Sequence, residues 1–292
     1  MFMRLKAAAV CRTFAKEDAR RDAGLTIPED VELLEAIAYG EQPMHTLDIS
    51  RPRGVSGALP LIVNVHGGGY VYGSTLPYRY YCASLAQRGF AVVSFNYRLA
   101  PKYKFPAPLQ DLNAVMDWCL RHAGEYGFDT ENIFMVGDSA GAQIASQYAA
   151  IVTTPDYAAI MGITPPKALR LSALGLNCGM YDLPRFLRSK AGAVAIMDCY
   201  FGKNPEVHGE KLDVLRFIGP DYPPCYLISS PGDFLLDCCV PMWETLRSRG
   251  VEAQYKLYGN KRTRHVFHVN IRRPLAAEAN DDETAFFRSF LR

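Results

Sequence analysis

Short runs of consecutive apolar residues alternate along this chain with stretches in which apolar residues recur every three or four positions. Near-continuous apolar runs are typical of strands buried on both faces, whereas the longer period is typical of helices packed on one face. We expect strands at 61–65, 90–95, 132–137, near 170–177, at 225–230 and, with more alternation and nearer an edge, at 253–258. The helical period predicts helices over 76–88, 107–123, 140–151 and 239–249. This order predicts an α/β fold with a mostly parallel sheet that helices cover on both faces.

Two segments interrupt the alternation. Residues 12–38 are interpreted as one or two helices, with Pro28 near the start of the second. Residues 178–217 form an aromatic-rich insertion with helical periodicity, and a long insertion inside an α/β domain is more often a lid or cap than a linker. We therefore expect one domain spanning 1–292, with a helical cap contributed by about 1–38 and 178–217.

Charge and cysteine content narrow the choice of partners and compartment. The 292 residues include 32 basic and 30 acidic ones, a net charge of +2, which does not favour a nucleic-acid or acidic-membrane partner. No apolar stretch approaches the ~20 residues of a spanning helix, and the apolar core of the first residues is too short for a signal peptide. Eight cysteines would suit a disulfide framework only in a secreted protein. We expect a soluble cytoplasmic protein with reduced thiols and no membrane partner.

The stretch Gly137-Asp138-Ser139-Ala140-Gly141 places a serine between two glycines, after a buried strand and before a good helix former. A strand, a tight turn and a helix are the context of a nucleophile elbow, in which close backbone contacts favour glycine. The alternative is a serine that only caps a helix, which would predict no catalytic partners elsewhere. Asp138 is expected to hold the elbow through backbone hydrogen bonds.

A second motif, His66-Gly67-Gly68-Gly69, follows directly on the strand at 61–65. Successive glycines can turn their backbone N–H groups toward a ligand at little steric cost. A phosphate-binding loop is the alternative, but it would continue with G-K-[ST], where Tyr70-Val71 stands here. The motif instead fits the oxyanion loop of lipases and esterases.

Together these motifs resemble those of the hormone-sensitive-lipase-like family of α/β-hydrolases. Further segments are similar to family motifs in the same order: FNYRLAP (95–101), KFPAPLQD (104–111), GDFLLD (232–237) and HVF (265–267). The likeness runs from about residue 40 to the C-terminus, and Val266 departs from the glycine that usually follows the family's histidine. It implies an α/β-hydrolase fold, a carboxylesterase active on short- to medium-chain esters without metal or cofactor, and a homodimer. It also makes His66 a residue that positions the glycine loop.

Residues and resemblance agree on the acid and the base. Asp233 lies just past the strand at 225–230, at the carboxyl end of the sheet where catalytic groups collect. Asp237 is the alternative and is expected to cap or charge a helix. His265 lies after the strand at 253–258 and completes the order Ser, Asp, His of this fold. The other histidines are expected elsewhere: His268 on a helix face, His45 on an early strand, His122 at a helix end and His208 in the insertion.

The predicted mechanism is acyl transfer. Asp233 orients His265, which takes the proton of Ser139 as its oxygen attacks an ester carbonyl. The predicted oxyanion hole consists of the backbone N–H groups of Gly67, Gly68 and Ala140. Cleavage of amides or sugar acetyl groups on the same triad is an alternative, as is a non-catalytic receptor.

Several residues outside the triad have weaker assignments. Three tyrosines near the motif loops either line the pocket or pack in the core: Tyr70, Tyr72 and Tyr97. An ion pair is expected between Arg98 and Asp111. The basic residues Lys261, Arg262 and Arg264 are expected to form a solvated loop, and the alternative hypothesis is that they attract carboxylate-bearing substrates.

Overall fold

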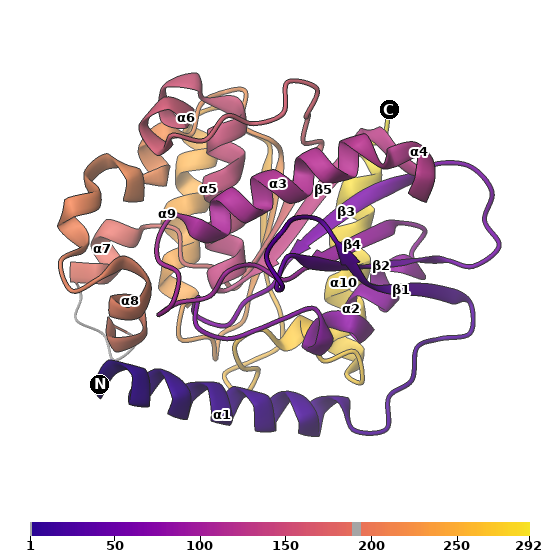
Figure 1. Ribbon diagram of the computed structural model, residues 1–292, viewed down its shortest axis with the longest axis horizontal. Helices are drawn as coiled ribbons and strands as arrows, with labels where there is room; N and C mark the ends of the chain where they lie inside the picture. Colours follow the sequence, from indigo (N-terminus) through magenta and orange to yellow (C-terminus); the bar gives the residue numbers. More distant parts are fainter. Residues whose placement is uncertain (1, 189–193) are drawn as a thin grey trace.

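The computed structural model describes residues 2–188 and 194–292, and an eight-stranded sheet runs through its centre (Figure 1). The strand order is β1-β2-β4-β3-β5-β6-β7-β8. The two pairs at the β1 edge are antiparallel, and every pair from β4 to β8 is parallel, so the expected α/β fold with a mostly parallel sheet is confirmed. The strands are β1 (Val31–Ala38), β2 (Thr46–Pro52), β3 (Leu59–Val65), β4 (Ala91–Phe95), β5 (Phe128–Asp138), β6 (Ala173–Asn177), β7 (Cys225–Ser229) and β8 (Ala253–Leu257).

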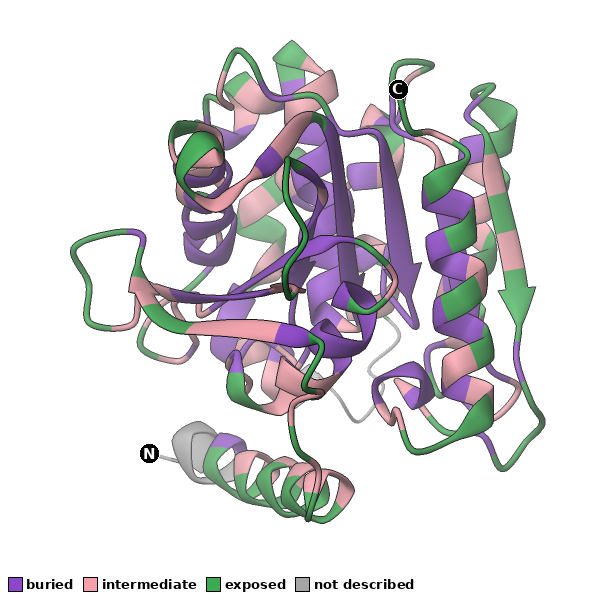
Figure 2. Ribbon diagram, turned by 90° about the vertical axis from the view of Figure 1, so that its right-hand side faces the viewer, coloured by how far each residue is buried: buried purple, intermediate pink, exposed green. Residues whose placement is uncertain are grey.

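Helices cover both faces of the sheet. Successive residues of a strand point to opposite sides, and in the central strands the residues on both sides are apolar, so both faces must be buried. On β3, Leu61 and Val63 pack into one apolar cluster while Ile62 between them packs into another. The first cluster includes α3, α5, α6 and α9, and the second includes α2 and α10. In Figure 2 the central strands are buried almost throughout. These helices are α2 (Arg79–Ala86), α3 (Ala107–Arg121), α5 (Ala140–Thr153), α6 (Pro155–Met161), α9 (Leu236–Ser248) and α10 (Pro274–Arg288); α4 (Ala123–Tyr126) is a single turn after α3.

The predicted core elements are in place, with ends that move by a few residues. The helix expected over 76–88 begins as a 3₁₀ turn, η1 (Leu76–Tyr78), and continues as α2. The strand expected nearer an edge, at 253–258, is β8 and forms the last strand of the sheet. The near-continuous burial of β4, β6 and β7 explains why apolar runs identified them.

The interpretation of residues 12–38 as helical is correct for its first part and wrong for its second. A long helix, α1 (Phe2–Asp22), comes first, but Val31–Ala38 is a strand paired antiparallel with β2. The apolar spacing in this strand resembles a helical one because a bulge lies between Leu34 and Ile37. At the bulge Ala36 has φ of 57° and donates its N–H to Asp48 Oδ1 at 2.8 Å. Pairing with β2 therefore overrides the local pattern.

The insertion at 178–217 lies at the same end of the molecule as α1. It contains α7 (Leu183–Arg188), α8 (Val194–Phe201) and two 3₁₀ segments, η2 (Pro205–Leu212) and η3 (Val214–Phe217). Residues 189–193 of the expected cap lie outside the described residues. Helix α1 packs against α8, and Figure 1 shows both beside the carboxyl-end loops of the sheet. Across the described residues, no helix is long and apolar enough to cross a membrane.

Candidate active site

Ser139 occupies the single-residue turn between β5 and α5. Its φ of 53° and ψ of −118° are strained for a residue with a side chain, and its N–H donates to the Asn177 carbonyl at 2.9 Å. Gly137 and Gly141, on either side of the turn, have no room for a side chain. A Cβ on Gly137 would lie 2.6 Å from the Gly141 carbonyl oxygen, and one on Gly141 would lie 2.0 Å from that of Val65. The segment from Gly137 to Gly141 therefore has the backbone geometry that is typical of a nucleophile elbow.

Asp233 and His265 come together from the loops after β7 and β8. His265 Nδ1 and Asp233 Oδ1 are 2.8 Å apart, and Oδ1 also accepts the Leu235 N–H at 2.8 Å. Oδ2 accepts the Ser229 hydroxyl at 3.0 Å. Burial by itself raises the pKa of Asp233, but the hydrogen bond and charge of His265 outweigh it and hold this pKa below its ordinary value. An ionised Asp233 therefore faces the imidazole.

Asp237 and His268, the alternatives for the acid and the base, contribute to the fold instead. Asp237 is in the first turn of α9, where a carboxylate favours the helix dipole. His268 is buried in the 3₁₀ turn η4 (Phe267–Val269), edge-on to Tyr81. Burial and the charge of His265 lower the pKa of His268 to about 3, so its ring is neutral.

The remaining histidines lie apart from this pair. His45 directly precedes β2, and His122 follows the last residue of α3. His208, in the insertion, has its Nε2 2.8 Å from the Phe201 carbonyl oxygen and packs on Phe105. Only His265 among the six histidines contacts Asp233 in the described structure.

A cavity of about 440 Å³ extends from the elbow to His265. Ser139, His265 and Tyr72 line it, together with the glycine loop. Helix α1 contributes Phe14 and Asp18, and the insertion contributes apolar side chains of α7 and α8. Ser139 and His265 therefore open into one largely apolar space, which segments far apart in the sequence cover.

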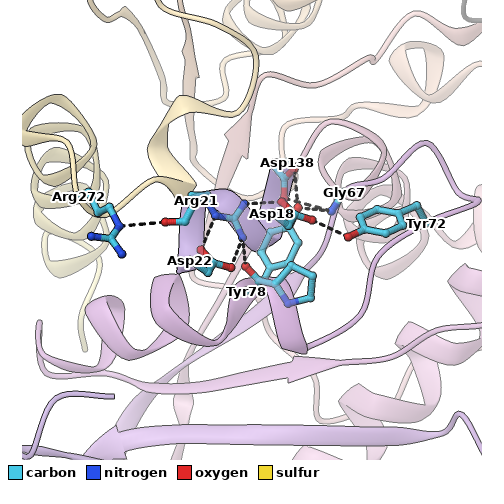
Figure 3. Close-up of polar contacts among 9 residues, drawn as sticks. Asp18, Arg21, Asp22, Gly67, Tyr72, Tyr78, Asp138 and Arg272 are labelled. Carbon is cyan, nitrogen blue, oxygen red and sulfur yellow. Dashed lines mark hydrogen bonds and ion pairs between the residues drawn. The ribbon is translucent and has the colours of Figure 1, made fainter. Parts of the chain in front are cut away.

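Within the glycine loop, the N–H of Gly67 is already used. It donates to Asp138 Oδ1 at 3.1 Å and to the Tyr78 hydroxyl oxygen at 2.9 Å, while the Tyr78 hydroxyl donates to Asp138 Oδ2 at 2.9 Å (Figure 3). Burial raises the pKa of Asp138 to about 6. Asp138 thus ties the elbow to the loop, and this geometry corrects the prediction of Gly67 as an oxyanion donor.

The next two glycines present free donors. Gly68 and Gly69 have φ of 116° and 61°, and a Cβ on Gly68 would lie 2.2 Å from the Tyr72 carbonyl oxygen. Among the described residues, the N–H groups of Gly68, Gly69 and Ala140 donate no hydrogen bond, and all three residues line the cavity. Ala140 begins α5, so its N–H has no partner within the helix.

His66 lies beneath this loop. Its Nδ1 is 2.8 Å from the Gly67 carbonyl oxygen, and its ring stacks on Tyr97 at 4.1 Å. The Tyr97 hydroxyl in turn donates to the His66 carbonyl at 2.8 Å. Burial lowers the pKa of His66 to about 4, so the ring stays neutral. Through these contacts His66 supports the glycine loop, as the family resemblance implied.

The predicted pocket tyrosines divide. Tyr72 lines the cavity, but Tyr97 packs under His66 and Tyr70 is fully buried. Tyr70 stacks on Tyr200 at 4.1 Å and donates to Gln143 Oε1 at 2.9 Å. The expectation that Tyr70 and Tyr97 line the pocket is corrected, because their rings fill space between the loop and the core.

Arg98 and Asp111 form the expected ion pair away from the cavity. Arg98 Nε lies 2.8 Å from Asp111 Oδ1, and the Arg98 N–H donates to Oδ2 at 2.7 Å. The pair therefore ties the FNYRLAP segment to α3.

Helix α1 is held over the cavity by polar contacts that Figure 3 shows together. The Tyr72 hydroxyl donates to Asp18 Oδ2 at 2.7 Å, and Arg21 donates to Asp18 Oδ1 at 2.8 Å. Arg21 also pairs with Asp22, and Arg272 Nε donates to the Arg21 carbonyl at 2.9 Å. No sequence motif contains these α1 residues, so sequence reasoning missed them.

Among the described residues, one group has the spacing of metal ligands: Cys178, Asp233 and His265, whose ligand atoms lie within 4.8 Å of one another. Burial and the neighbouring Asp233 raise the pKa of the Cys178 thiol well above its ordinary value. A metal requires the thiolate, and the other two groups already bond to each other. The hydrogen-bonded Asp–His pair accounts for this cluster.

A family profile described as the alpha/beta hydrolase fold matches residues 62–269. The chain belongs to this family. The matched residues include every element of the site except α1, and the expected resemblance and fold are confirmed.

Relatives of this α/β-hydrolase include an acetyl esterase of Salmonella schwarzengrund. It is 26% identical over 246 residues, 78% of this chain and 71% of the relative. The inhibited esterase B of Lactobacillus rhamnosis has TM-score 0.90 and 26% identity, covering 99% of this chain and 97% of its own. The hyperthermophilic esterase of the archaeon Pyrobaculum calidifontis has TM-score 0.77 and 25% identity, covering 97% of this chain and 93% of its own. The similarity to solved esterases therefore includes α1 as well as the sheet.

Proposed function

We propose that Ser139, His265 and Asp233 are the catalytic triad of this carboxylic ester hydrolase. The observation that carries the proposal is the 2.8 Å contact between Asp233 and His265, because His265 lines the same cavity as the strained Ser139. The esterases among the relatives support the same reaction class.

The mechanism follows from which nitrogen of His265 is occupied. Ionised Asp233 accepts the Nδ1 proton, which leaves Nε2 free to take the proton of Ser139. The serine oxygen attacks the ester carbonyl, and the developing oxyanion accepts hydrogen bonds from Gly68, Gly69 and Ala140. Each such donor contributes about 3 kcal/mol to stabilising the transition state. His265 then passes its proton to the leaving alcohol, and water repeats the attack on the acyl-enzyme.

The cavity favours short- to medium-chain acyl groups. Its volume of about 440 Å³ is near the lower end of the range for small-molecule sites. Met180, Phe186 and Ile196 are among its apolar lining. Esterase B of Lactobacillus rhamnosis has been solved with a tributyrin phosphonate, a short-chain inhibitor, which supports the same range. We propose that α1, α7 and α8 form the cap that limits acyl length.

The decisive test is Ser139→Ala with p-nitrophenyl butyrate. We expect kcat to fall by at least about 10⁴-fold, while the urea unfolding midpoint is retained. Ser146→Ala is the matched control, because Ser146 lies on α5 and its hydroxyl donates to the Gln143 carbonyl. A serine-directed organophosphate should add one covalent group to the wild type and none to Ser139→Ala. Unchanged turnover in Ser139→Ala contradicts the assignment of the nucleophile.

A substrate panel tests the reaction class. Esters and the matching p-nitroanilides are compared at equal acyl length, and we expect turnover of the esters to dominate. Activity on anilides alone would refute an esterase. A cytoplasmic location, a homodimer and the absence of nucleic-acid partners stay predictions.

A further inference from the structure

A second hollow, of about 260 Å³, adjoins the active-site cavity. The two spaces share lining residues from α1 and from the loop that carries the base: Glu17, Asp18, Arg21, Arg264, His265 and Val266. Ser139 and the glycine loop line only the first space. The second hollow is therefore an extension of the active site that begins at His265.

Positive charge is concentrated in this extension. Its charged lining consists of four arginines and two carboxylates: Arg21, Arg262, Arg264, Arg273, Glu17 and Asp18. The excess of two positive charges equals the net charge of the whole chain, which is +2. The extension therefore carries a net positive charge.

Most of these arginines are available to a ligand. Arg21 is neutralised by Asp18 and Asp22. The side chains of Arg262, Arg264 and Arg273 are exposed and form no hydrogen bond or ion pair with the residues that the structure describes. Glu17 is the one carboxylate of the hollow without an ion-pair partner among the described residues. Its negative charge therefore weakens the attraction of the three arginines for an anion.

The position of His265 decides which part of a substrate reaches the hollow. In acyl transfer the protonated base must hydrogen-bond the leaving oxygen. The leaving group therefore departs on the side of His265, whereas the acyl carbonyl stays between Ser139 and the free N–H groups of the glycine loop. A leaving group that extends past His265 enters the arginine-lined extension.

We propose that this extension is a subsite for an anion on the leaving group, so that the enzyme selects esters whose alcohol part carries a carboxylate or a similar anionic group. The inference rests on the proposed esterase function and adds its substrate class. Hydrolysis cleaves the acyl C–O bond, adds water, and releases an alcohol that retains its anion. Arg264 and Arg273 attract that anion, and Glu17 weakens the attraction.

Two acetyl esters of equal size test the proposal: 3-acetoxybenzoate, with an anionic leaving group, and neutral 3-acetoxybenzamide. The quantity measured is the ratio of their kcat/KM values, in which any common loss of catalysis cancels. We expect Arg264→Gln and Arg273→Gln each to lower this ratio about two- to five-fold, and salt to lower it in the wild type. Glu17→Gln should raise it.

Arg249→Gln is the matched control. Arg249 is exposed and follows α9 just before β8, at the amino edge of the sheet and therefore opposite the site. It should keep both the ratio and the wild-type activity. A third pair of esters, with the carboxylate on the acyl part instead, should respond less to the arginine variants.

The possible outcomes distinguish failure of the anion subsite from failure of the proposed esterase function. Hydrolysis of the neutral ester with a ratio that none of the three site variants alters overturns the anion subsite and leaves the esterase intact. A stronger response of the acyl-side pair also overturns it. Failure of the wild type to hydrolyse either ester overturns the proposed function itself.

Discussion

Glu283 of α10 is buried against β6, and replacing it with glutamine tests how the sheet holds a carboxyl in its interior. The residue is 1% exposed, and its Oε1 lies where a Cβ on Gly175 would be 2.1 Å away. Tyr81 donates to Oε2 at a long 3.4 Å. Burial raises the pKa of Glu283 from 4.5 to about 7, although Asn177 and Tyr81 oppose the rise.

The sign and size of the effect follow from these two pKa values. Between pH 4.5 and about 7 the unfolded chain has lost the Glu283 proton while the folded protein keeps it. The folded state then binds more protons, so its stability falls as pH rises through this window. One pKa unit is worth about 1.4 kcal/mol, so the loss approaches about 3 kcal/mol above pH 7. Below pH 4.5 the contribution is fully present.

Glu283→Gln removes the titrating proton and keeps the shape. The amide keeps an oxygen that can accept the Tyr81 hydroxyl, and it cannot ionise. We expect the free energy of unfolding, measured by urea titration, to match the wild type near pH 4.5. At pH 8 the variant should be more stable by up to about 3 kcal/mol.

The matched control is Glu278→Gln, an exposed glutamate of the same helix that lies 3.5 Å from Lys256. Its loss should change the unfolding free energy by less than about 1 kcal/mol, with no added pH dependence between 5 and 8. Parallel curves of unfolding free energy against pH for Glu283→Gln and the wild type would refute the reasoning, because the buried carboxyl would then titrate alike in both states.

Two further substitutions test the catalytic pair and the elbow. Asp233→Asn should lower kcat toward p-nitrophenyl butyrate about 10⁴-fold, because the amide no longer favours the required tautomer of His265; retention of most of the activity would contradict this role. Gly141→Ala should lower the unfolding free energy by about 3 kcal/mol or prevent folding, since the added Cβ would lie 2.0 Å from the Val65 carbonyl oxygen. Gly124→Ala, where a Cβ meets nothing within 4 Å, is the control, and equal effects on soluble yield and urea midpoint would count against the steric argument.

Local pattern was sufficient for the centre of the fold. The runs that form β3, β4 and β7 are almost wholly buried. A strand that is buried on both faces requires consecutive apolar residues, so these strands can be predicted from the sequence. The elbow was also readable, because Gly137 and Gly141 are demanded by contacts within a short segment.

Contacts between distant segments decided what the pattern could not. The strand β1 has a spacing that fits a helix, and only its pairing with β2 makes it a strand. Gly67 looked equivalent to Gly68, yet Asp138, 71 residues away in sequence, accepts its N–H. Tyr70 and Tyr72 stand two positions apart, and packing turned one into the core and the other into the cavity.

The sequence by itself therefore determined the sheet, the order of the proposed catalytic residues and the class of chemistry, because these depend on local burial and short-range sterics. Only the tertiary structure decided which N–H groups are free, which tyrosine lines the cavity, and that Arg21 of α1 lines the same hollow as Arg264. Those features depend on which distant side chains use up a donor or fill a space, and no local spacing encodes that.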